Sequence, residues 1–394
     1  MARRLARRAD QLLSHAGLLQ AAAAPAREAP GLDAIVVPTA RRIRGDAEQA
    51  ATLLGTARLA ESLGTRLIAL ASRDAGREDI SELLAAHGVA VDLVAIDAPR
   101  VPGGGHPYLE TTEMLTGTDF ERDADVSQKR NLALLLARSV GWRRIAFLDD
   151  DITVPDPADL RRAAGALNGH AVVGLRVGGF EDNSVVCHAR RALGDPQDTF
   201  VGGGAMVVSL ARAAEAFFPD VYNEDWFFLL GEARLRGVAR FGAVRQRPFD
   251  PFEDTRRALD QEFGDTLAEG VFAVLSRGGT IRDTLNEGYW MGFLATRRRL
   301  IQQLLVRATT TRHEPGRDRM ITALQAARAR SYLIEPRACL RFLLAWRRDR
   351  LEWSDAVAAL PTTLRLEEAL HEFGLAHATT VHLGRRARRP LFRR

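Results

Sequence analysis

Lysine, cysteine and long apolar runs are scarce in this chain, and the last two scarcities each argue against a class of protein. The only two cysteines among the 394 residues, Cys187 and Cys339, lie far apart and without metal-ligand spacing. We therefore expect no disulfide framework, and the composition suits a reducing cytoplasm. No apolar run reaches membrane-spanning length, and polar residues interrupt the segment after the basic N-terminus, which makes a poor signal peptide. Lys129 is the only lysine, so arginine supplies the other basic side chains.

The net charge of +5 is carried by the two ends of the chain. Residues 385–394 contain six arginines, residues 1–10 contain four arginines and one aspartate, and the remainder is mildly acidic. Outside the two ends, the sequence has no cluster of basic residues that would form a positively charged groove on a folded face. We therefore expect no nucleic-acid partner. Charged tails of this kind are usually solvated, and a peripheral contact with an anionic membrane surface is the alternative role.

Strand-length apolar runs alternate with helix-length segments through the first 250 residues. We expect strands at 33–39, 66–71, 89–96, 145–148, 170–177, 199–210 and 239–244, and helices at 47–63, 79–87, 127–140, 159–167 and 211–217. This alternation is typical of an α/β fold with a Rossmann-like, mostly parallel sheet flanked by helices. Such sheets bind ligands at the carboxyl ends of their strands.

The pattern divides the chain into four parts. We expect an N-terminal helix and linker at 1–31, the α/β domain at 32–253, a helical region without further strands at 254–384, and a basic tail at 385–394. Within the helical region the predicted helices are 282–306, 319–332, 337–353 and 366–373. Their apolar spacing suits packing onto the α/β domain or onto a second subunit, so a homo-oligomer is one expectation.

Three consecutive carboxylates, Asp149, Asp150 and Asp151, end the apolar strand predicted at 145–148. Adjacent carboxylates repel one another, and the pKa of each would rise unless a cation lies among them. A divalent metal is the simplest such cation, because Mg²⁺ binds oxygen ligands from one or two carboxylates together with substrate phosphates. A solvated acidic turn or helix start is the structural alternative.

Four motifs, in this order, resemble those of the nucleotide-sugar glycosyltransferases of the GT-A fold, close to the large family 2 and to mannosylglycerate or glucosyl-phosphoglycerate synthases. They are Val36-Val37-Pro38-Thr39, Lys129-Arg130-Asn131, Asp149-Asp150-Asp151 and Asn223-Glu224-Asp225-Trp226, and they span residues 33–250. The resemblance implies a metal-dependent transferase, a hexosyltransferase in particular. It would move a sugar from a UDP- or GDP-linked donor to a hydroxyl acceptor that the sequence does not identify, using Mg²⁺ or Mn²⁺.

The resemblance also assigns roles on the donor side. Asp151 would ligate the metal, Asp149 would bind the metal or the ribose, and Asp150 would face the ribose. Lys129 and Arg130 begin a helix, where the helix dipole also favours a phosphate. The donor site would further include Pro38, Thr39, Arg41, Ser72, Asp74 and Asn131.

On the acceptor side the resemblance places Glu224 and Asp225. Asp225 is the candidate general base if the reaction inverts the anomeric centre; if it retains configuration, the pair would orient the acceptor. Gly203 and Gly204 would let the backbone approach a sugar, and Trp226 would stack on one. Their structural alternatives are a β-bulge and a core aromatic residue.

The sequence departs from the family pattern and admits other functions. Ser72 and Asp74 stand where the family often carries a base-reading aspartate, and only Asp250 or Glu253 is available as a late metal ligand. Asp149, Asp151 and Thr153 also match the Asp-x-Asp-x-Thr signature of haloacid-dehalogenase-like phosphatases. In that family the first aspartate, here Asp149, is the nucleophile. A non-catalytic interaction scaffold is the third hypothesis.

Overall fold

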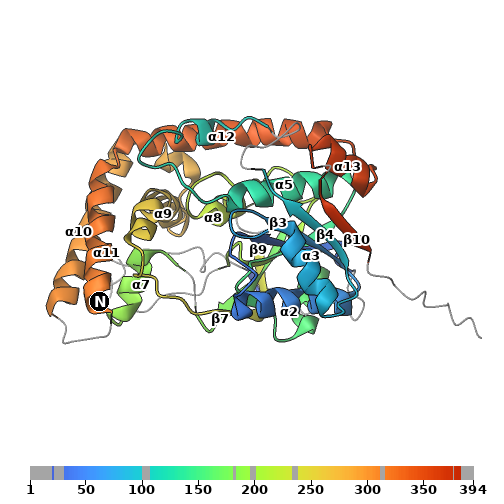
Figure 1. The fold of residues 1–394 in the computed structure, drawn as a ribbon. Coiled ribbons are helices and arrows are strands. Elements are labelled where there is room, and N and C mark those ends of the chain that lie inside the picture. Colours follow the sequence, from blue (N-terminus) through green and yellow to red (C-terminus); the bar gives the residue numbers. More distant parts are fainter. Residues whose placement is uncertain are drawn as a thin grey trace, which may run out of the picture.

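The computed structural model describes residues 20–21, 31–99, 107–180, 183–195, 201–232, 238–310, 316–375 and 377–382 (Figure 1). The basic tail predicted at 385–394 lies outside these residues. So does nearly all of the N-terminal helix and linker predicted at 1–31, in which only the short strand β1 (Gln20–Ala21) and residue 31 are described.

The described strands form one mixed sheet, mostly parallel, in the order β1-β9-β7-β8-β5-β2-β3-β4-β10, with β6 paired to β9. The strands are β2 (Ala34–Thr39), β3 (Arg66–Ala71), β4 (Asp92–Asp97), β5 (Arg144–Leu148), β6 (Ile152–Thr153), β7 (Val172–Gly178), β8 (Ala205–Ser209), β9 (Val238–Gln246) and β10 (Thr379–His382). β8 runs antiparallel to both β5 and β7, and β10 runs antiparallel to β4. The predicted α/β class, a mostly parallel sheet flanked by helices with a helical C-terminal region, is confirmed.

Alternate residues of the central strands point into two separate cores, one on each face of the sheet. Val36, Ile68 and Phe147 belong to a core that also contains α5 (Val126–Ser139), α8 (Glu224–Glu232) and most of the C-terminal helices. Their chain neighbours, such as Val37, Leu67 and Leu148, point into the second core. That core is covered by α2 (Ala47–Leu63), α3 (Arg77–Ala86) and α6 (Pro157–Ala166). This period-two arrangement explains why the strands are apolar throughout.

The C-terminal helices are α9 (Thr255–Leu275), α10 (Glu287–Thr310), α11 (Arg317–Leu333), α12 (Pro336–Ala359) and α13 (Leu366–Glu372), and shorter helices elsewhere are α4 (Glu110–Glu113), α7 (Val185–Ala192) and η2 (Ile281–Thr284). In Figure 1 two of the C-terminal helices, α10 and α11, stand at the left end of the molecule, and α12 and α13 lie along its top. Trp290, Trp346 and Trp353 are buried in the same core as Phe147 of the sheet. In the part of the chain that the structure describes, no helix is both long and apolar enough to cross a membrane.

Several local predictions are wrong. The segment 211–217 forms turns rather than a helix, although Ala213, Ala216 and Phe217 are buried as a helical pattern would require. The strand predicted at 199–210 begins only at Ala205, because the glycines before it form a turn. The helical region does contain a strand, since β10 joins the sheet at its edge; four residues of Thr-Thr-Val-His give too short a pattern to recognise.

Pro38 lies inside β2, as the predicted strand 33–39 requires. Proline is tolerated there because β5 pairs only with Ala34, Ile35 and Val36, so Pro38 lies beyond that ladder.

Candidate active site

A cavity of about 250 Å³ opens where β5 ends and β8 begins. Because β8 is antiparallel to β5, Ala205 pairs with Leu148, and the glycine turn before β8 meets the aspartates after β5. The remaining wall comes from the starts of α5 and α8 and the ends of β7 and β9. The lining residues are Arg122, Val126, Arg130, Asp149, Val177, Asn183, Gly202, Gly204, Tyr222, Asn223, Glu224, Asp225, Trp226 and Gln246.

Arg130 bridges two of the predicted carboxylates inside this cavity. Its Nη2 donates to both carboxylate oxygens of Asp149, at 2.7 and 3.0 Å, and its Nη1 donates to Oε1 of Glu224 at 2.9 Å. Burial acts to lower the pKa of Arg130, but Asp149 and Glu224 outweigh burial and raise it above its usual value. Arg130 is therefore a buried cation between the aspartates that follow β5 and the acidic start of α8.

Asp225 reaches the same cavity from the first turn of α8. Its carboxylate accepts from the backbone N–H of Gly203 at 2.7 Å and from that of Trp226 at 2.8 Å. Burial, and then the neighbouring Glu224, raise the pKa of Asp225 to about 6, against the opposing effect of Arg130. A carboxylate with this pKa is ionised at neutral pH and is a stronger base than an ordinary aspartate.

The glycine turn is required by the charged side chains around it. A Cβ at Gly203 would overlap the guanidinium of Arg130, and a Cβ at Gly204 would lie 2.9 Å from Oδ2 of Asp149. The turn precedes β8, so the alternative of a β-bulge within a strand is wrong. Trp226 lines the cavity but is only 7% exposed and packs edge-on against Phe272, which makes it largely a core residue.

A second polar group lies beside the cavity, at the carboxyl ends of β2, β3 and β5. Thr39 Oγ1 donates to Asp150 at 2.6 Å. Arg41 lies 3.2 Å from Asp150 and donates to Asp151 at 3.2 Å, with almost half of its own side chain exposed. The cations among the three aspartates are thus the guanidinium groups of Arg41 and Arg130.

Lys129 links this group to α5. Its ammonium donates to the Thr39 carbonyl at 2.8 Å and to Ser72 Oγ at 2.6 Å, and it forms an ion pair with Asp125 at 3.0 Å. Burial lowers the pKa of Lys129, although Asp125 acts in the opposite direction. Asp74 lies exposed just beyond Ser72, with its backbone N–H bonded to the Ala40 carbonyl.

Asn131 belongs to the motif Lys129-Arg130-Asn131, but it does not line the cavity. Its side-chain amide exchanges two hydrogen bonds of 2.8 Å with the backbone of Phe218. The residue therefore fixes the chain before α8, a role that the sequence does not distinguish from ligand binding.

Sequence reasoning missed Arg122 and Tyr222. Arg122 donates to Glu224 at 3.1 Å and to the Val221 carbonyl at 2.9 Å, and its guanidinium lies over the ring of Tyr222. Arg122 comes from an irregular segment before α5, where no periodicity marks a residue as facing a cavity.

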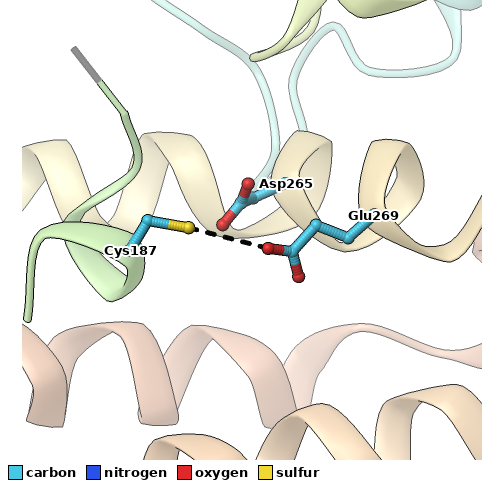
Figure 2. A group of neighbouring side chains, drawn as sticks. All are labelled: Cys187, Asp265 and Glu269. Carbon is cyan, nitrogen blue, oxygen red and sulfur yellow. Dashed lines mark hydrogen bonds between the residues drawn. The ribbon is translucent and has the colours of Figure 1, made fainter. Parts of the chain in front are cut away.

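A three-donor group suited to a metal gathers elsewhere among the described residues. Figure 2 shows Cys187 of α7 facing Asp265 and Glu269 on α9. The buried guanidinium of Arg297 donates to both Asp265 and Glu269, and burial raises the pKa of Glu269 to about 8. Arg297 supplies a positive charge to both carboxylates of this group, where a metal ion would otherwise balance them. The residues predicted to hold one, Asp149 and Asp151, lie at the end of β5.

No family model matches the sequence, and no curated protein matches it. Among solved structures, it is similar to a mannosyltransferase from Pyrobaculum calidifontis in complex with GDP-mannose and Mn²⁺, at 15% identity over 84% of this chain and 89% of that one, with a TM-score of 0.37. It is also similar to residues 1–349 of S. aureus TarS in complex with UDP-GlcNAc, at 12% identity over 76% and 90%, with a TM-score of 0.35. A putative nucleotide-diphospho-sugar transferase from Desulfovibrio desulfuricans matches at 12% identity over 69% and 97%, with a TM-score of 0.32. These scores are low, and the architecture is established by the strand order itself.

Proposed function

We propose that the protein is a glycosyltransferase that moves a sugar from a nucleoside-diphosphate sugar to a hydroxyl acceptor. One observation carries the proposal: Asp149 and Asp225, from motifs 76 residues apart in the chain, line one cavity and are joined through Arg130 and Glu224. The motif order supports it, because the resemblance assigns the first aspartate to the donor and the second to the acceptor.

Asp225 is the proposed general base. In an inverting transfer, the acceptor oxygen attacks the anomeric carbon and the bond from that carbon to the diphosphate oxygen breaks. The hydroxyl proton passes to the Asp225 carboxylate, and the nucleoside diphosphate leaves with the bonding electron pair. The raised pKa of Asp225, about 6, suits this role because the group is unprotonated at pH 7 and accepts a proton readily.

The cations near the strand ends are the proposed donor-binding groups. Arg130 is held rigidly, whereas Arg41 is partly exposed and free to contact a phosphate when Asp151 has another partner. Arginine binds phosphate through several donors at once, which favours a diphosphate as the ligand. Thr39 and Asp150 lie beside Arg41, where the ribose would be recognised.

The donor set at the end of β5 fits a divalent cation in its chemistry. Asp149 and Asp151 offer the hard oxygen ligands that Mg²⁺ and Mn²⁺ prefer, and Asp149 is about one-third exposed on the cavity wall. Asp151 would hold the ion with Asp149, and Arg41 would give up its contact with Asp151. When bound, the ion would neutralise charge on the departing diphosphate.

The test is a panel of UDP- and GDP-linked sugars offered to the protein with Mg²⁺ or Mn²⁺, followed by measurement of released UDP or GDP. We expect release with one donor class and stimulation by an acceptor. Release of inorganic phosphate from sugar phosphates, without use of any nucleotide sugar, would instead support the phosphatase hypothesis. If neither a nucleoside diphosphate nor inorganic phosphate is released, the result supports the scaffold hypothesis.

A further inference from the structure

Asn223, directly before Glu224 and Asp225, has an unusual backbone conformation. Its φ is +63°, and apart from Arg73 it is the only non-glycine residue with a positive φ in the described ranges. Its carbonyl accepts from the N–H of Phe227 at 3.2 Å, so Asn223 occupies the capping position of α8. A capping residue normally has extended φ and ψ angles, so the left-handed conformation of Asn223 sets the start of α8 apart from the other helix starts.

The Asn223 side chain is directed away from its own helix. A capping asparagine usually accepts a hydrogen bond from the first turn, but here its Nδ2 donates to Oδ1 of Asp265, on α9, at 3.0 Å. Asp225 takes part of the capping role, since its carboxylate accepts from the N–H of Trp226. The capping side chain thus forms a tertiary contact at the wall of the cavity.

Asp265 is itself held by a buried arginine. Arg297, on α10, is fully buried and donates to Oδ2 of Asp265 at 2.7 Å, to both carboxylate oxygens of Glu262 at 2.6 and 2.7 Å, and to Glu269. Glu269 also accepts a hydrogen bond from Cys187 (Figure 2). With its partners fixed, the Arg297 guanidinium leaves Asp265 one orientation, with Oδ1 toward Asn223.

The backbone of α9 also lies directly against the residue before Asn223. A Cβ at Gly264 would overlap the backbone of Tyr222, so only glycine permits this approach. Two neighbouring residues of α9 therefore act on two neighbouring residues of the loop: Gly264 sets the distance to Tyr222, and Asp265 sets the conformation of Asn223.

We propose that Asp265, oriented by Arg297, is a positioning residue that fixes the start of α8 through Asn223 and thereby aims Glu224 and Asp225 into the cavity. This inference rests on the proposed function for its effect on catalysis. It gives the helical region a defined part in the site, because α9 and α10 supply the contacts while neither Asp265 nor Arg297 lines the cavity.

The first experiment compares two glycine substitutions that each remove an asparagine side chain at a helix start. Asn223→Gly keeps the left-handed conformation accessible but deletes the bond to Asp265. The matched control is Asn286→Gly, which deletes the side-chain cap of α10, where Asn286 accepts from Gly288 and Tyr289. We expect Asn223→Gly to lower kcat by about tenfold or more with the donor KM unchanged, because misplacement of a catalytic group costs rate rather than donor binding. Asn286→Gly should leave kcat unchanged.

The second experiment exchanges the two partners. Asn223→Asp alone places two carboxylates together and should lose most of the activity. Adding Asp265→Asn restores a donor and an acceptor across the pair, and its Oδ1 still accepts from Arg297. We expect the double variant to regain most of the lost kcat. If the double variant has the melting temperature of the wild type but not its kcat, the positioning role is refuted.

Amide hydrogen exchange tests the positioning independently of any activity. The N–H groups of Gly203 and Trp226 both donate to Asp225, so their protection reports its placement. We expect faster exchange at both in Asn223→Gly and unchanged exchange in Asn286→Gly. Unchanged exchange in Asn223→Gly refutes the inference. Faster exchange in a protein that releases no nucleotide supports the inference and refutes the proposed glycosyltransferase instead.

Discussion

Asp225 is the residue on which the proposed chemistry depends most directly. Asp225→Asn should spare donor binding, because the donor-side groups are untouched, and should lower kcat by about 10²- to 10⁴-fold through loss of the base. Calorimetric titration with the donor and steady-state rates separate the two effects. Asp220→Asn is the matched control: burial also raises the pKa of Asp220 to about 6, but the side chain does not line the cavity. Equal losses in both variants would contradict the assignment.

The pH dependence of the rate follows from the raised pKa of Asp225. A base must be unprotonated, so kcat/KM should be constant above neutral pH and fall tenfold per pH unit below about pH 6. An ordinary aspartate would place this fall about two pH units lower. The fall of kcat/KM at low pH should persist in Asp220→Asn and should disappear from the residual activity of Asp225→Asn. If it persists in Asp225→Asn, another group is responsible for the pH dependence.

Asp151 is the residue on which the metal assignment is tested. Asp151→Ala should abolish Mn²⁺ binding and metal-dependent donor binding, both measured by calorimetry, because one of two carboxylate ligands is lost. Asp156→Ala is the control. Asp156 lies five residues after Asp151 and caps α6, so this variant should leave the Mn²⁺ affinity unchanged. Unchanged turnover in Asp151→Ala would show that the metal assignment is wrong.

For single residues, the sequence predicted which residue types belong to the site better than it predicted where their side chains point. The strand-end carboxylates are recognisable because three adjacent aspartates directly follow an apolar strand, and Asp149 and Asp225 do share a cavity. The sequence could not show that Asn131 faces the Phe218 backbone or that Arg122 reaches Glu224. Such directions depend on tertiary packing of segments far apart in the chain.

At the scale of elements, the close approach of α9 to the loop before α8 predicts a sharp difference between two helical glycines. Gly264→Ala should lower the free energy of unfolding by about 3 kcal/mol, because the new methyl group would overlap the Tyr222 backbone. Gly292→Ala, at an exposed position of α10 with open space around it, should raise that free energy by about 0.5–1 kcal/mol. Urea denaturation measures both. A stable Gly264→Ala variant would mean that α9 and the loop separate easily.

Elements with strong local signals were predicted well. The helix α2 matches its predicted range, and Gly64 ends it in a left-handed conformation, with φ of 64°. The segment 211–217 was predicted wrongly because alanine and phenylalanine periodicity cannot distinguish a buried turn from a short helix. β10 was missed because its partner strand, β4, is almost 290 residues away in the chain.

At the scale of the whole molecule, one core joins the sheet to the C-terminal helices. Phe147, Phe218 and Phe227 share it with Trp346 and Trp353. We therefore expect a single cooperative unfolding transition, seen alike by far-ultraviolet circular dichroism and by tryptophan fluorescence. A fragment ending at residue 253 would lose the C-terminal helices from this core and should not fold. Two separate transitions, or a folded fragment, would show that the boundary predicted near residue 253 divides independent domains.

The solitary amine of Lys129 has a practical consequence. Its side chain is buried at the junction of α5 with the ends of β2 and β3. An endoproteinase specific for lysine therefore has one cutting position in the entire polypeptide, and that position is shielded as long as α5 stays docked. The rate of cleavage into two pieces would measure how often α5 separates from the ends of β2 and β3. If the proposed donor binds there, it should slow the cleavage.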